Sequence, residues 1–182
     1  MNNVFARTWA GFVLLVWAVG GAQAQQMPET AQAWLDALST AEVVEFTESD
    51  VKNLLSTTKA LQAAGLDDLV DDNAPMDALA ALEGNAEARS ILKSNGYSPE
   101  KFSSHMMNIA MAMGAAEMQA NKAEIDASIA QLQMLKDQIP PAQYEALYAQ
   151  VVGVQEIFAR APAGNVELAE KYRTELEALG EE

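Results

Sequence analysis

Methionines form the clearest set of candidate ligands in the sequence. Met107, Met111 and Met118 recur at helical spacing, which places their side chains along one stripe of a predicted helix. Thioethers are soft ligands that bind Cu(I), so one hypothesis is metal handling through this stripe. The single histidine, His105, projects about 200 degrees away from Met107, and we expect it at a polar helix edge. Methionine also fills irregular helical cores, and core packing is our preferred interpretation of the stripe.

Residues for covalent catalysis are scarce. The chain has no cysteine and one histidine, which excludes thiol chemistry, Cys–His pairs and multi-histidine metal sites. Neither a G-x-S-x-G motif nor a glycine-rich phosphate loop is present. The 26 acidic residues leave a carboxylate-dependent hydrolase open as an alternative, because a catalytic acid pair is recognised by its separation in space. We expect neither an enzyme nor a cofactor.

An acidic run at residues 67–73 concentrates oxygen ligands of the kind that Ca²⁺ prefers. It lacks the alternating acids and the glycine of a calcium-binding loop, so we interpret it as a solvated turn. The residues concerned are Asp67, Asp68, Asp71, Asp72 and Asn73.

The first 24 residues have the three parts of a secretory signal peptide. Arg7 is their only charge, an apolar stretch covers residues 9–19, and Ala22 and Ala24 form an A-x-A cleavage site. The stretch is shorter than the about 20 residues of a transmembrane helix, and no cysteine follows it to carry a lipid anchor. We expect cleavage after Ala24 and release into the periplasm of a Gram-negative bacterium, or secretion, without stable membrane insertion. An uncleaved membrane anchor is the alternative.

Acidic charge limits the partners of the remaining chain. Loss of Arg7 leaves 10 basic and 26 acidic residues, a net charge of -16. Such a surface repels nucleic acid phosphates and anionic lipid, so we expect no nucleic acid partner. Residues 25–182 have the usual length of one domain, and without disulfides its core must hold by packing alone.

Helical spacing of apolar residues predicts an all-α fold, because sustained alternation of the kind seen in half-buried strands is missing. Ser98 and Pro99 give the best-marked helix start. The helix after them is apolar on two sides and should therefore be central. One side carries Phe102, Met106, Ile109 and Met113, and the other carries Met107, Met111, Gly114 and Met118.

Further helices surround this central one. The patterns predict a short helix around Trp34, one over 48–64 behind Thr47 as cap, and two short ones opened by Pro75 and Asn85. Beyond Asn121 the central helix either continues or restarts, and Pro140-Pro141 forces a break. Asn165 is expected to cap the last helix. The sequence thus predicts an irregular bundle of about six or seven short helices in one domain, residues 25–182.

Two helix starts resemble the LTxxQ motifs of small periplasmic stress chaperones, which are also exported and all helical. They are Tyr97-Ser98-Pro99-Glu100-Lys101 and Ile139-Pro140-Pro141-Ala142-Gln143. The first has Tyr, Ser and Lys for Leu, Thr and Gln, and the second keeps Gln143 but has Pro140 for Thr. The layout also resembles that of uncharacterised exported helical proteins of Gram-negative bacteria, a likeness that implies no activity.

These features favour a non-catalytic protein that binds a protein or peptide partner, as an adaptor or a chaperone-like protein, in an apolar groove between helices. Methionine-rich surfaces adapt to several partners, which suits such a groove. The groove requires that some methionine and aromatic side chains stay exposed. The ligand and the oligomeric state are left open.

Overall fold

The computed structural model describes residues 29–66, 68–71 and 75–179. Within these ranges the chain is helical and has no strand, which confirms the predicted all-α class. The predicted signal peptide, with Ala22 and Ala24, lies outside them. The helices are α2 (Glu29–Thr40), α3 (Glu48–Ala63), α4 (Asp68–Asp71), α5 (Pro75–Gly84), α6 (Ala86–Ser94), α7 (Pro99–Ala120), α8 (Lys122–Met134), α9 (Pro141–Phe158), α10 (Ala163–Lys171) and α11 (Arg173–Ala178). They outnumber the six or seven expected, partly because Tyr172 divides the last predicted helix in two.

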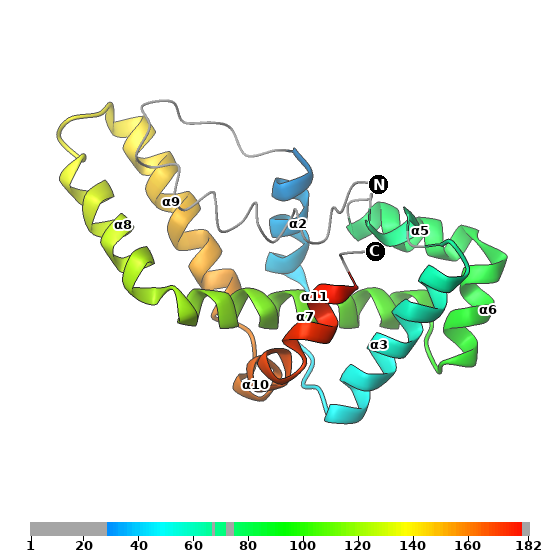
Figure 1. Cartoon of the computed structure of the whole chain (residues 1–182). Coiled ribbons are helices and arrows are strands. Elements are labelled where there is room, and N and C mark those ends of the chain that lie inside the picture. The colour runs from blue at the N-terminus through cyan, green and yellow to red at the C-terminus, as the bar shows by residue number, and fades with distance from the viewer. Residues whose placement is uncertain (1–28, 67, 72–74, 180–182) are drawn as a thin grey trace.

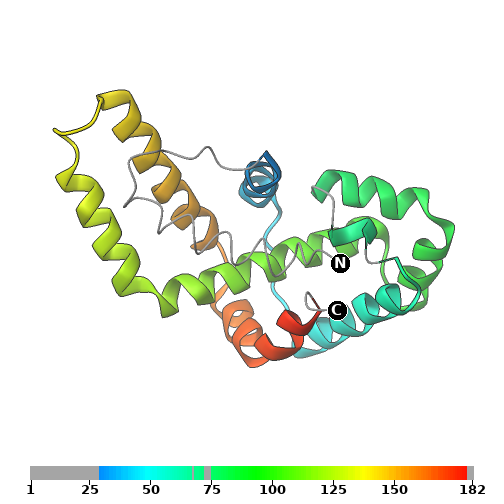
Figure 2. The same cartoon turned by 45° about the horizontal axis from the view of Figure 1, so that its top comes forward.

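Helix α7 is the axis of the molecule (Figure 1). Helices α3, α5 and α6 gather around its first half, and α2 lies on the opposite side of α7 from α10 (Figures 1 and 2). At the other end of α7 the chain turns into α8 and returns through α9, and these two helices project from the body as an arm (Figures 1 and 2). None of the helices in the described ranges has the length and apolarity needed to cross a membrane.

The two apolar sides predicted for α7 face two separate core clusters. Phe102, Met106, Ile109 and Met113 are buried in the first cluster, among residues of α3, α5, α6, α10 and α11. The second cluster contains buried Met111, partly buried Met107 and Met118, and residues of α2, α9 and α10. Burying each such side chain stabilises the fold by about 1.5–3 kcal/mol. The central position predicted for this helix is confirmed.

Several predicted helix boundaries are also confirmed. Thr47 and Asp50 form a capping box at the start of α3, and the Ser98 hydroxyl accepts a hydrogen bond from the Lys101 amide at the start of α7. Gly65 and Gly96 follow α3 and α6 with φ of 68° and 77°, the left-handed conformation that glycine adopts without a steric penalty.

The prediction that Asn165 caps the last helix is wrong. Helix α10 begins at Ala163 after Pro162, so Asn165 lies inside the helix and is buried. Its amide group instead holds the extended segment 41–47, because its Nδ2 donates to the Val44 carbonyl at 2.7 Å and its Oδ1 accepts from the Phe46 amide at 2.8 Å. A carboxamide has the same kinds of donor and acceptor as a peptide group, so it can form the hydrogen bonds that a neighbouring strand would form.

Asn108 of α7 bonds to the same segment two residues earlier, at Glu42 and Val44. Its Nδ2 donates to the Glu42 carbonyl at 2.8 Å, and its Oδ1 accepts from the Val44 amide at 2.9 Å. We call Asn108 and Asn165 together the asparagine clamp. The clamp provides hydrogen-bond partners for four partly buried backbone groups between α7 and α10.

Arg160 stabilises the end of α2. Its guanidinium donates to the carbonyls of Leu38 at 2.9 Å and Ala41 at 2.6 Å, and also to that of Ser39. The last carbonyls of a helix have no partner within it and carry partial negative charge, so a cation with several donors suits this end.

Candidate binding pocket

A pocket of about 330 Å³ lies where the arm joins the body. This volume is within the range of small-ligand pockets, about 300–1,000 Å³. Helices α7, α8, α9 and α10 each contribute to its wall, and we call it the elbow pocket. Its lining residues are Ala115, Met118, Gln119, Lys122, Ile125, Asp126, Gln155, Phe158, Ala159, Ala161, Ala163 and Val166.

The bend that opens the pocket lies at Asn121. The sequence left a continuous or a restarted helix open here, and the structure has a break between α7 and α8. The Asn121 side chain caps no amide of α8. Its Nδ2 donates instead to the backbone carbonyl of Glu117 at 3.1 Å and to the Oε1 atom of the Glu117 carboxylate at 2.6 Å. Arg173 of α11 donates to the other carboxylate oxygen of Glu117 at 3.0 Å, which ties the end of α7 to the body.

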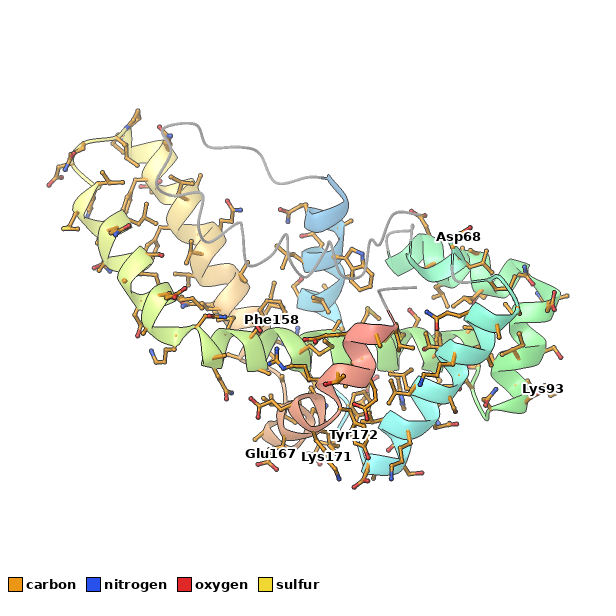
Figure 3. The ribbon with its side chains drawn as sticks, viewed as in Figure 1. Asp68, Lys93, Phe158, Glu167, Lys171 and Tyr172 are labelled. Carbon is orange, nitrogen blue, oxygen red and sulfur yellow. The ribbon has the colours of Figure 1, made fainter. Side chains whose placement is uncertain are left out.

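Phe158 provides the apolar floor of the pocket. It ends α9, is 4% exposed and lies beside α7 (Figure 3). The ring approaches the backbone of α7 at Gly114, where a Cβ atom would lie 2.6 Å from both Cδ1 and Cζ. Gly114 therefore makes room for this ring, and only a residue without a side chain permits the approach.

Polar groups of the pocket lie among the apolar lining residues. Lys122 and Asp126 form an ion pair of 2.6 Å on one turn of α8, and both are exposed. Gln119 and Gln155 add carboxamides that can donate and accept hydrogen bonds. Asp126 is the only carboxylate among the residues that line the pocket. This arrangement can hold an apolar group and orient a polar one, and it provides no pair of acids facing each other.

The arm keeps much apolar surface accessible. Only Ile125, Leu132 and Phe158 are buried in its two helices. Met134 is 68% and Tyr148 37% exposed, and the rings of Tyr144 and Tyr148 stack with centroids 5.9 Å apart. Exposed methionine and aromatic side chains, which the groove hypothesis required, are therefore present on α8 and α9, while Met118 of the pocket wall is partly buried.

The structure brings the three predicted copper ligands to one cluster but leaves them unequally accessible. Met111 is fully buried in the second core cluster, while Met107 and Met118 pack at its edge. Met118 also lines the elbow pocket. Core packing, our preferred interpretation of the stripe, therefore fits Met111 best. In the described residues, His, Asp and Glu form no group of three that is close enough to hold a metal ion.

His105 is buried rather than at a polar helix edge, because two loops cover it. Its ring centroid lies 5.0 Å from that of Phe46 and 5.4 Å from that of Tyr97, and His105 Nδ1 and the Tyr97 hydroxyl share a hydrogen bond of 3.3 Å. Burial, with help from the charge of Lys101, lowers the pKa of His105, while Asp50 opposes this. Burial and the charge of Asp50 raise the pKa of Tyr97 to about 12. The lowered pKa favours the neutral imidazole, and the ring takes part in packing.

Glu48 is the carboxylate with the most strongly shifted pKa in the described residues. Hydrogen bonds from Lys171, Lys52 and Tyr172 lower its pKa to about 2. Lys171 and Tyr172 reach it at 2.7 Å each from the end of α10, so the start of α3 is tied to that helix (Figure 3). This group is exposed and paired, as expected of a structural ion pair at a helix start.

The remaining sequence features take structural positions. Both LTxxQ-like segments start helices, α7 and α9, with proline in the first turn. In the acidic run Asp68 and Asp71 bound α4, and Asp67, Asp72 and Asn73 lie outside the described residues. The chain also has four Ser-x-x-Lys spacings, and all eight side chains are exposed on or at the start of α3, α6 and α7. They are Ser49 to Lys52, Ser56 to Lys59, Ser90 to Lys93 and Ser98 to Lys101.

Comparison of the chain with protein-family models, with curated protein sequences and with solved structures gives no match. The function must therefore be inferred from the geometry of the chain itself.

Proposed function

We propose that this chain is an exported, non-catalytic helical protein, acting in the periplasm, that binds an apolar segment of a protein or peptide partner in the elbow pocket. The observation that supports the proposal is an apolar pocket of about 330 Å³ at the base of an arm whose methionine and tyrosine side chains stay accessible. Apolar pockets between helices accept the anchoring side chains of amphipathic segments.

Charge favours a basic partner. Residues 117–158, from the end of α7 to the end of the arm, contain six acidic residues and two lysines, and the whole chain has a net charge of -15. A basic amphipathic helix would place its apolar side chains in the pocket and its lysines against the surrounding carboxylates. Opposite charges of this kind mainly increase the association rate and the specificity.

A pocket-filling variant tests the proposal. Ala163 lines the pocket, is exposed and begins α10, so Ala163→Trp fills the pocket without entering the core. Ala86 begins α6, is also exposed and lies outside the pocket lining, so Ala86→Trp is the matched control. The probe is a fluorescent leucine- and lysine-containing amphipathic peptide, titrated by anisotropy.

We expect Ala163→Trp to weaken binding of the probe at least tenfold and Ala86→Trp to leave it unchanged. Equal affinities for both variants and the original chain would reject the elbow pocket as the binding site. If Ala163→Trp weakens binding as expected, photo-crosslinking from position 119 in the pocket should identify the natural partner in cells, with position 93 on α6 as the distant control.

A further inference from the structure

The extended segment 41–47 has one hydrogen-bonding edge occupied and one vacant. In an extended chain the N–H and C=O of one residue point to the same side, and those of the next residue point to the opposite side. Four inward-pointing groups bond to the asparagine clamp: the carbonyl of Glu42, the amide and carbonyl of Val44, and the amide of Phe46. The backbone groups of Val43 and Glu45 therefore point away from the clamp.

These outward groups have no hydrogen-bond partner within the part of the chain that the structure describes. The neighbouring side chains are accessible, since Val43 is 39% exposed and Glu42 and Glu45 are also exposed. An exposed strand edge with free N–H and C=O groups is a template for pairing with another extended chain.

We propose that the outer edge of segment 42–46 binds an extended basic peptide by strand addition. The asparagine clamp holds the segment in strand geometry from the inner side. The segment therefore loses little further conformational entropy when a second strand pairs with it. The backbone of Val43 and Glu45 then offers two donors and two acceptors. This surface is separate from the elbow pocket and does not depend on it.

Charge selects the partner. Glu42 and Glu45 take part in no ion pair between residues of the described ranges. A second copy of this chain would bring four carboxylates and no cation to one two-stranded ribbon, so self-pairing is disfavoured. Val43 and Glu45 are two positions apart and so lie on one face of the segment. A partner strand matches them when it has an apolar residue opposite Val43 and a lysine opposite Glu45.

Hydrogen exchange tests the edge in the full chain. In the free protein we expect the amides of Val44 and Phe46 to exchange slowly, and those of Val43 and Glu45 to exchange at least tenfold faster. The probe is the capped peptide Thr-Lys-Thr-Val-Thr-Lys-Thr, which presents lysine two positions from valine in either strand direction. At saturation it should slow exchange at Val43 and Glu45 at least tenfold.

A charge swap separates pairing at this edge from loss of folding. Glu45→Lys should weaken binding of the lysine peptide at least fivefold. The same variant should bind the peptide with glutamate in place of both lysines more tightly than the original chain does. The same lysine peptide with every amide N-methylated should give no protection, and Ala163→Trp should leave binding unchanged. Slow exchange of the Val43 and Glu45 amides in the free protein would overturn the proposal. So would exchange of these amides that is not slowed at millimolar concentrations of the lysine peptide. Equal slowing by the N-methylated peptide would also overturn it.

Discussion

Replacing Gly114 by alanine probes the contact that joins the arm to the body. The new Cβ would lie 2.6 Å from Cδ1 and from Cζ of Phe158, and nearer still to Cε1. Contacting carbon atoms are normally about 3.5–4.0 Å apart, so the methyl group overlaps three ring atoms by about 1 Å. The ring is 4% exposed and must shift within a packed core, together with the end of α9.

Two opposing free energies set the size of the effect. Overpacking a core costs about 1–3 kcal/mol, and simultaneous overlap with three atoms of a rigid ring places this site near 3 kcal/mol. Alanine gains about 1 kcal/mol over glycine in a helix interior. Gly114→Ala should therefore lower the unfolding free energy by about 2 kcal/mol.

Gly153 of α9 provides the matched control, because a Cβ there would meet no atom within 4 Å. Gly153→Ala has the same helix-propensity gain without the overlap, so it should raise the unfolding free energy by about 1 kcal/mol. Urea denaturation of both variants measures the difference, expected at about 3 kcal/mol, with an unchanged m-value.

A second substitution identifies the ring as the cause. In a Phe158→Leu background, Gly114→Ala should cost at least about 1 kcal/mol less than in the original chain, because the overlapping ring is gone. If Gly114→Ala and Gly153→Ala shift the urea midpoint equally and in the same direction, the contact between Phe158 and the α7 backbone does not have the geometry described.

Three further predictions concern the polar contacts. Asn165→Asp keeps an acceptor for the Phe46 amide but sets an oxygen against the Val44 carbonyl, so urea denaturation should show a loss of about 2–4 kcal/mol. Arg160→Met leaves the end of α2 without its cation and should cost about 1–3 kcal/mol, with faster amide exchange in α2. The pKa of His105 is lowered from 6.5 on folding, so the unfolded chain takes up the proton first as the pH falls. Stability should decrease from pH 6.5 towards pH 5, and His105→Leu should lack that decrease.

Controls for these three come from the same chain. The Asn85 side chain only accepts hydrogen bonds, at the start of α6, so Asn85→Asp should be neutral or slightly stabilising. Lys59→Met alters an exposed cation of α3 that is remote from the end of α2 and should change stability by less than about 0.5 kcal/mol. Because His105 is the only histidine, a decrease that persists in His105→Leu would assign the pH dependence to carboxylates instead.

The sequence predicted those parts of the fold that depend on local spacing. The two-sided pattern of α7 required burial on both sides whatever its neighbours were, and Ser98 with Pro99 fixed its start. The elbow pocket depends on a bend at Asn121, where the local signals allow both a continuous and a restarted helix. The sequence offered no means of choosing between them.

Long-range contacts account for the errors. Asn165 has the residue type of a helix cap, but its amide is used by Val44 and Phe46, about 120 positions earlier in the chain. His105 is polar and was expected at an edge, but Phe46 and Tyr97 reach over it from two loops. Local propensity contains no information about such partners, because they are set by tertiary packing.

The asparagine clamp also has a consequence for the order of folding. Its bonds join residues 64 or 66 positions apart at Asn108 and 119 or 121 positions apart at Asn165, so closing these loops costs chain entropy that short-range helical contacts do not. The clamp can close only after α7 and α10 have docked. Until then Val43, Val44 and Phe46 form an uncovered β-prone run, the kind of segment that aggregates during folding. Glu42 and Glu45 flank and interrupt that run, and their charges keep nascent chains apart until the segment is bound.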